Sequence, residues 1–124
     1  MTAPQDCFAV LEGALYCLGP FGSRALRHEP LATAILEFRR GPLCTYVREH
    51  PYGLLPGVPN LYCLDGAHRL AWMADWPLAT DPCARILDER NGELIAQAAS
   101  GAMVRLDALT GRFIGLSVPA AEAI

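Results

Sequence analysis

The sequence predicts a small, single-domain protein of mostly β structure, an antiparallel meander with at most one short helix. The chain has 124 residues, an ordinary size for one domain. Its hydrophobic fraction of 52% is sufficient for an ordered core. Turn residues recur at short intervals in the second half, and these separations leave no room for the crossover helices of a parallel sheet. The strands are therefore expected to form a small two-sheet sandwich or a partial propeller-like sheet.

The C-terminal half carries the clearest strand signals. Asn91-Gly92 is the strongest two-residue hairpin signal and stands between two runs of strand-forming residues. Gly66, Ser100-Gly101 and Thr110-Gly111 mark further turns. The pattern predicts strands at residues 60–65, 69–74, 84–88, 93–98, 102–107 and 112–114.

The segment 30–41 allows two interpretations. Pro30 can begin a helix, and the apolar residues that follow it have helical spacing. Alternatively, residues 32–38 and 43–48 flank a turn at 39–42 and form a hairpin. We prefer the hairpin, because the second of these runs is rich in β-branched and aromatic residues.

One domain is expected to span residues 1–124. Residues 50–59 hold three prolines and two glycines, a composition that predicts a loop joining two strand-rich halves. The two ends, 1–6 and 119–124, have the composition of frayed termini.

An internal repeat is visible at the junctions between strands and turns. Residues 15–19, 61–65 and 103–107 align at offsets of 46 and 42 residues, and an arginine follows each copy. A period in the forties built from short strands is typical of propeller blades. Strand alternation in the third copy places Arg105 on the wetter face. By the same register we expect Cys17 and Cys63 to be the less buried thiols, and the core positions to be Leu18, Leu64 and Leu106.

Residues 100–114 resemble the blade repeat of quinoprotein-like and WD-type β-propellers, with a Leu-Asp strand end and a Thr-Gly turn. Residues 60–72 are similar but degenerate. The resemblance implies that Asp107 accepts hydrogen bonds from turn amides, that Gly111 adopts a left-handed conformation, and that Trp72 fills the space between sheets.

This resemblance covers about half of the chain and implies no cofactor or catalytic residue. A closed propeller needs at least four blades, and the chain has material for about two or three. It can therefore form a partial sheet, close a ring by oligomerising, or fold as a compact sandwich. We prefer the sandwich.

Composition argues against several classes of partner and of location. The net charge is −3 and the pI is near 5.5, so neither nucleic acid nor a membrane surface is an expected partner. An odd number of cysteines and the lack of a bilayer-length apolar run favour a reduced, cytoplasmic protein. All ten basic residues are arginine, which indicates a GC-rich, bacterial genome.

Four cysteine and histidine residues are candidates for metal binding. Cys44 with His50 and Cys63 with His68 are close pairs that together supply tetrahedral zinc ligands. Their spacings match no standard finger or ribbon, so the expected outcome is no metal and no cofactor. A Cys-His nucleophilic pair is a weaker alternative, because nothing in the sequence orients the histidine.

Aromatic residues in loops are candidates for partner binding. Trp76 stands beside a proline just past a predicted strand, where it is either exposed or folded back over the sheet edge. Tyr52 and Phe21 also fall in loop-like segments. We expect a non-enzymatic β module, a small bacterial accessory protein that binds another protein or its own copy as a homodimer. The alternative is a small enzyme or zinc-binding domain that uses the cysteines and histidines.

Overall fold

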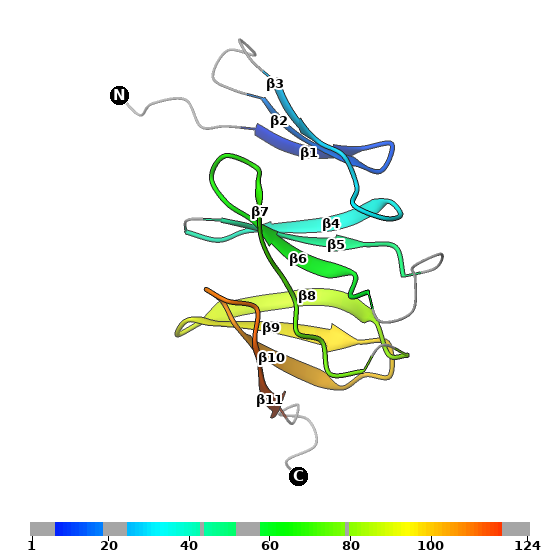
Figure 1. Ribbon diagram of the computed structural model, residues 1–124, viewed down its shortest axis with the longest axis vertical. Coiled ribbons are helices and arrows are strands. Elements are labelled where there is room, and N and C mark those ends of the chain that lie inside the picture. Colours follow the sequence, from blue (N-terminus) through cyan, green and yellow to red (C-terminus); the bar gives the residue numbers. More distant parts are fainter. Residues whose placement is uncertain (1–6, 19–24, 43, 52–57, 79, 118–124) are drawn as a thin grey trace.

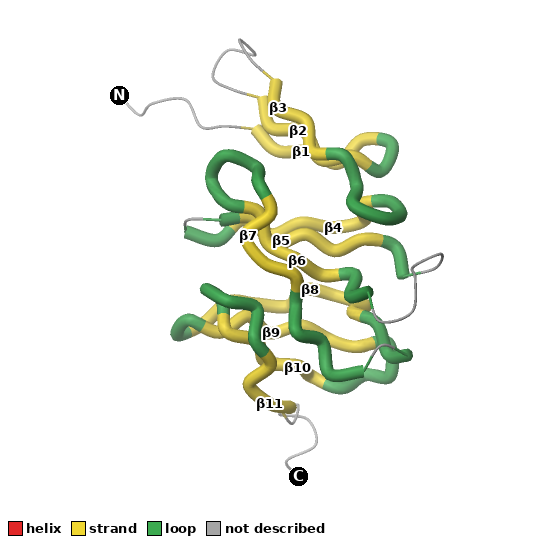
Figure 2. Tube along the Cα trace, viewed as in Figure 1, coloured by secondary structure: helices red, strands yellow, loops and turns green. Residues whose placement is uncertain are grey.

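The structure is a computed structural model, and it describes residues 7–18, 25–42, 44–51, 58–78 and 80–117. These residues form eleven β-strands and no helix (Figure 2). The described part of the chain therefore holds no helix with the length and apolar character needed to cross a membrane. The predicted antiparallel, mostly β meander is confirmed.

The strands divide among three antiparallel sheets, and in each sheet neighbours in sequence are neighbours in space. The N-terminal sheet contains β1 (Cys7–Leu11), β2 (Ala14–Leu18) and β3 (Ala25–His28). The middle sheet contains β4 (Ile35–Arg40), β5 (Thr45–Glu49), β6 (Leu61–Leu64) and β7 (Leu70–Met73). The C-terminal sheet contains β8 (Cys83–Arg90), β9 (Glu93–Ala98), β10 (Met103–Asp107) and β11 (Phe113–Ser117).

The three sheets are stacked face to face, and the middle sheet separates the other two (Figure 1). One apolar cluster lies between the N-terminal and middle sheets and includes Leu15, Val47 and Leu64. A second, larger cluster lies between the middle and C-terminal sheets and includes Tyr46, Leu94 and Leu106. All four residues of β6 are buried, because β6 lies in the layer covered on both faces.

Several local predictions are confirmed. Residues 35–40 and 45–49 pair as an antiparallel hairpin, so the helical interpretation of 30–41 is wrong. Asn91 and Gly92 both have positive φ, as a tight two-residue hairpin turn requires. The segment 50–59 lies between β5 and β6, which are neighbours in the middle sheet, and because its residues 52–57 lie outside the described part of the chain, the predicted loop stays a prediction.

The three aligned repeat segments are β2, β6 and β10. β6 and β10 are each the third strand of a four-stranded sheet, and each has a register shift against the next strand at the same repeat position. The shift falls between Cys63 and Leu64 in β6 and between Arg105 and Leu106 in β10. Two of the three copies, β6 and β10, therefore occupy equivalent strand positions with equivalent irregularities, whereas β2 is the middle strand of a three-stranded sheet and has no such shift.

Alternation along the repeat decides which sheet each side chain meets. In β6, Leu61 and Cys63 face the C-terminal sheet, whereas Tyr62 and Leu64 face the N-terminal sheet. In β10, Val104 and Leu106 are buried against the middle sheet. Arg105 lies on the opposite face, partly exposed, with its Nη1 atom 3.1 Å from Oε1 of Glu93. The predicted wetter face of this strand is confirmed.

The prediction that Cys17 and Cys63 are the less buried thiols is wrong. Their exposed fractions are 6% and 1%. Cys63 is buried because the middle sheet is covered on both faces, and Cys17 lies on the face of β2 that packs on the middle sheet. Leu64 and Leu106 are buried as predicted, and the side chain of Leu18 lies outside the described residues.

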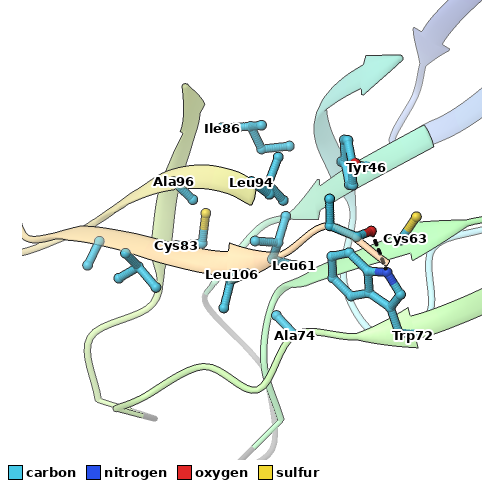
Figure 3. Close-up of a cluster of buried hydrophobic side chains, with 13 residues drawn as sticks. Tyr46, Leu61, Cys63, Trp72, Ala74, Cys83, Ile86, Leu94, Ala96 and Leu106 are labelled. Atoms are coloured by element: carbon cyan, nitrogen blue, oxygen red, sulfur yellow. Dashed lines mark hydrogen bonds between the residues drawn. The ribbon is translucent and has the colours of Figure 1, made fainter. Parts of the chain in front are cut away.

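Trp72 packs between the middle sheet and the C-terminal sheet and connects them (Figure 3). Its ring lies in the apolar cluster between these sheets, and its Nε1 atom donates a hydrogen bond to the Ala108 carbonyl at 3.2 Å. A Cβ atom added at Gly111 would lie 2.3 Å from the Trp72 ring, so only glycine permits this approach. Gly111 has a φ of 75° and Asp107 accepts hydrogen bonds from the turn amides, both as predicted.

Asn60 adds a buried polar connection between the same two sheets. Its side-chain amide donates to the carbonyls of Glu49 and Cys83, both at 2.8 Å. Its side-chain oxygen accepts from the Cys83 backbone N–H at 2.9 Å. Asn60 is 2% exposed, so its polar groups are satisfied within the protein.

Candidate functional site

The four candidate metal ligands lie in three different places. Cys44 and Cys63 lie on the same side of the middle sheet, where both pack in the cluster against the C-terminal sheet. His50 follows the opposite end of β5 from Cys44. His68 lies in the turn between β6 and β7, with its ring centroid 5.5 Å from that of Phe8. Across the residues that the structure describes, no group of three or more metal-ligating side chains is close enough to hold an ion.

The Cys44 and Cys63 thiols belong to a row of polar groups in an otherwise apolar interface. Tyr46 lies opposite Cys63 in the β5–β6 ladder, and its hydroxyl hydrogen-bonds to the Glu89 carboxylate. Burial raises the pKa of the Tyr46 hydroxyl, and its hydrogen bond with Glu89 raises it further. Burial likewise raises the pKa of the Cys63 thiol. Only Cys44 of the two cysteines is partly exposed.

The Trp76 side chain is folded back against the middle and C-terminal sheets. It is half-buried against the cluster between the middle and C-terminal sheets, and its Nε1 atom donates to the Asp81 carbonyl at 2.5 Å. This is the second of the two positions expected for it. Tyr52 and Phe21 lie outside the described residues, so the role of all three in partner binding stays a prediction.

A buried polar chain between the N-terminal and middle sheets carries no signal in the sequence. Glu49 is 1% exposed, and its carboxylate accepts hydrogen bonds from the backbone N–H groups of Leu31, Ala32 and Thr33 at 2.6–3.0 Å. It also accepts from the Tyr62 hydroxyl at 2.5 Å. This carboxylate thus fixes the connection between β3 and β4 to the end of β5.

His28 is the third member of this buried row of hydrogen-bonded side chains. Its Nε2 atom lies 2.7 Å from the Tyr62 hydroxyl oxygen. Because the single hydroxyl proton of Tyr62 goes to Glu49, Nε2 of His28 must carry the proton that it shares with Tyr62. The row His28–Tyr62–Glu49 therefore satisfies its own polar groups and holds the N-terminal sheet on the middle sheet.

The electrostatics of this chain follow from its burial. Burial lowers the pKa of His28, and His68 adds to this effect, against the opposing attraction of Glu49 and Glu29. Burial by itself would raise the pKa of Glu49, but the hydrogen bonds from Tyr62 and the 31–33 backbone outweigh it and lower this pKa. At neutral pH the row therefore consists of the neutral His28 imidazole, the neutral Tyr62 phenol and the Glu49 carboxylate.

These two shifts predict that the protein loses stability on acidification. Below its ordinary pKa of 6.5, His28 binds a proton more readily in the unfolded chain, so stability falls as pH falls. Glu49 stabilises the fold above its ordinary pKa of 4.5, and that contribution is lost as pH falls through its lowered folded pKa. Urea unfolding between about pH 7 and about pH 5 is expected to show falling stability. A His28→Asn variant is expected to flatten that slope, and an unchanged slope would contradict the assignment.

Exposed apolar side chains gather on the last strands of two sheets. On β11, Phe113, Ile114 and Leu116 have exposed fractions of 37%, 42% and 62%. On β7, Leu70 and Met73 are exposed by 49% and 37%.

The end of β7 lies beside the start of β11. The Asp75 backbone N–H donates to the Gly111 carbonyl at 2.8 Å, just before β11 begins. Within the described residues, β7 pairs only with β6, and β11 only with β10. The two strands thus present neighbouring edges that carry apolar side chains and that no further described strand covers.

Comparison with known proteins adds no family to this description. No protein-family model matches the sequence, and no curated protein matches it significantly.

Proposed function

We propose that this protein is a non-enzymatic β module that associates with a second copy of itself through the edge of β11. The observation that carries the proposal is the character of that edge. β11 reads Phe-Ile-Gly-Leu-Ser, with no charged residue and no proline, and three of its side chains are exposed apolar groups. Strand edges that remain in water usually carry charges or prolines that discourage pairing.

Two of the other three edge strands of the larger sheets differ, while the third, β7, also lacks charge and proline but is only four residues long. β4 contains Glu37, Arg39 and Arg40, and β8 contains four charged residues near its end and middle. The charged residues of β4 and β8 discourage pairing of these edges with another strand, whereas β11 has no such residues. This contrast supports β11 as the edge that pairs.

A two-fold dimer follows naturally from an antiparallel edge. When β11 pairs with β11 of a second copy in antiparallel orientation, each copy contributes the same residues to the interface. The pairing gives the β11 edge the strand partner that it lacks among the described residues, and it covers Ile114 and Leu116. Neither step needs a cofactor or a ligand.

Sedimentation velocity with matched variants tests the proposal. The wild-type protein is expected to sediment as a dimer, and Leu116→Arg as a monomer, because the buried guanidinium would lack a partner. Leu36→Arg is the control, because Leu36 is 47% exposed on the charged edge strand β4 and should leave the dimer intact. A wild-type protein that is monomeric at all micromolar concentrations, or a Leu116→Arg protein that remains a dimer, would overturn the proposal.

We further propose a cytoplasmic role as a small bacterial accessory protein. The described cysteines are reduced, and those of the apolar cores behave as small hydrophobic residues. Binding of another protein at the same β11 edge is the other outcome that this surface allows. It would appear as a monomer whose β11 edge is covered only when that protein is added.

A further inference from the structure

The row Glu89–Tyr46–Cys44–Cys63 is the polar cluster that the association function does not use. Cys44 is partly exposed, and Cys63, which lies across the β5–β6 ladder, is 1% exposed. Cys44 lies two residues before Tyr46, and Tyr46 pairs directly with Cys63 in the β5–β6 ladder. Cys63 belongs to the apolar cluster between the middle and C-terminal sheets, and Cys44 packs against that cluster. A Cβ atom added at Gly41 would lie 3.3 Å from the Cys44 sulfur and 3.4 Å from the Tyr46 hydroxyl, which places these two groups side by side.

The backbone at Cys44 has fewer strand partners than that at Cys63, and its carbonyl accepts from the Gly41 N–H across the turn at 2.8 Å. Cys63 lies inside β6 and pairs with both neighbouring strands. Cys44 precedes β5, and the β5–β6 register begins only at Thr45. It follows a turn that contains Gly41 and Pro42. A small movement at this corner can therefore change the distance between the two sulfur atoms, as a disulfide requires.

We propose that Cys44 is a site of oxidation by hydrogen peroxide and that Cys63 resolves it, so that the two residues form a disulfide between the start of β5 and β6. In the first step, the Cys44 thiolate attacks a peroxide oxygen, the O–O bond breaks, and the leaving hydroxide takes a proton to become water. Cys44 is now a sulfenic acid.

In the second step, the Cys63 sulfur attacks the Cys44 sulfur. The S–O bond breaks, and the leaving oxygen takes the Cys63 thiol proton and departs as water. Two thiols are thus oxidised by two electrons, and one peroxide is reduced to two waters. Burial raises the pKa of the Cys63 thiol, so this second step is expected to accelerate as pH rises.

Cys83 and Cys17 differ from Cys44, because both are buried. Cys83 is 0% exposed, and its thiol hydrogen-bonds the Arg85 carbonyl at 3.5 Å. Cys17 is buried between the N-terminal and middle sheets. Peroxide is therefore expected to act at Cys44 before either of these thiols.

Peptide mapping after peroxide treatment tests the inference on the intact protein. Trypsin places Cys44 in peptide 41–48, Cys63 in 49–69 and Cys83 in 70–85, while both remaining cysteines fall in 1–24. After brief exposure to peroxide and blocking of free thiols, peptides 41–48 and 49–69 are expected to be joined, lighter than their sum by two hydrogens. Disulfide formation should be faster at higher pH.

Two variants separate the steps. Cys63→Ala is expected to leave Cys44 as a sulfenic acid that dimedone traps, and Cys83→Ala is expected to keep the wild-type cross-link. The same experiment on Leu116→Arg should give the same link, because the inference is independent of self-association. A folded wild-type protein whose Cys44 stays unmodified, is oxidised only to sulfinic acid, or links equally to several cysteines would overturn the inference.

Discussion

Glu49→Ala is expected to lower the free energy of unfolding by about 3 kcal/mol, because it leaves the buried Tyr62 hydroxyl and three partly buried backbone N–H groups without an acceptor. The wild-type carboxylate accepts from Tyr62 and from three consecutive backbone N–H groups, while its own residue is 1% exposed. Alanine removes the acceptor for all four donors and opens a small cavity. Equilibrium urea unfolding at neutral pH measures the change.

Two comparisons make the Glu49 result specific. Glu49→Gln keeps one acceptor oxygen and is expected to cost about half as much. Glu29→Ala removes an exposed glutamate that only ion-pairs with Arg27 at the surface, so it should change stability by about 0.5 kcal/mol or less. Equal losses for Glu49→Ala and Glu29→Ala would show that the buried polar chain does not hold the N-terminal sheet.

Gly111→Ala is expected to destabilise the protein by about 3 kcal/mol, the sum of a strained backbone and a steric overlap. Gly111 has a φ of 75°, which alanine adopts only at a cost. Its added Cβ would also lie 2.3 Å from the Trp72 ring, so the ring or the turn must move. Thermal or urea unfolding monitored by Trp fluorescence reports both the loss and the displaced ring.

Gly92→Ala is the matched control for this substitution. Gly92 has a nearly equal φ of 78°, but no atom lies within 4 Å of an added Cβ, so only the strain of about 1 kcal/mol remains. The difference between the two variants isolates the contact with Trp72. In a Trp72→Leu background, Gly111→Ala should fall to the cost of Gly92→Ala. A Gly111 variant no less stable than the Gly92 variant would contradict the packing.

The strands of the C-terminal half could be predicted in detail because its turns contain residues with strong turn preferences. Asn91-Gly92 fixes one hairpin through positive φ at both residues, and Asp107 fixes another by accepting turn amides. β6 to β11 were therefore located to within a few residues. The hairpin of β4 and β5 followed from β-branched and aromatic residues on its second strand.

The number of sheets was harder to predict, because it depends on which faces pack together. Alternation correctly placed Arg105 on an outer face, but it could not show that β6 is covered on both sides. Cys63 was for that reason expected to be more exposed than it is. The sequence does not predict β3, because Ala25–His28 is only four residues long and contains no β-branched residue and no Phe, Tyr or Trp.

The candidate sites depend on contacts between residues far apart in the sequence. Glu49 meets the 31–33 backbone and Tyr62 only when β5 lies between them, and no spacing rule connects Glu49 to His28. The proximity of Cys44 to Cys63 likewise depends on the β5–β6 register. Sequence analysis selected both cysteines as candidate zinc ligands, but the two histidines proposed with them lie elsewhere.

Self-association through β11 is the central claim, and hydrogen exchange measured against protein concentration tests it most directly. If two copies pair at this edge, amides in residues 113–117 should exchange more slowly as concentration rises, while those of β4 should not change. Exchange in β11 that is the same at every concentration, or protection that appears at β4 or β8 instead, would contradict the claim.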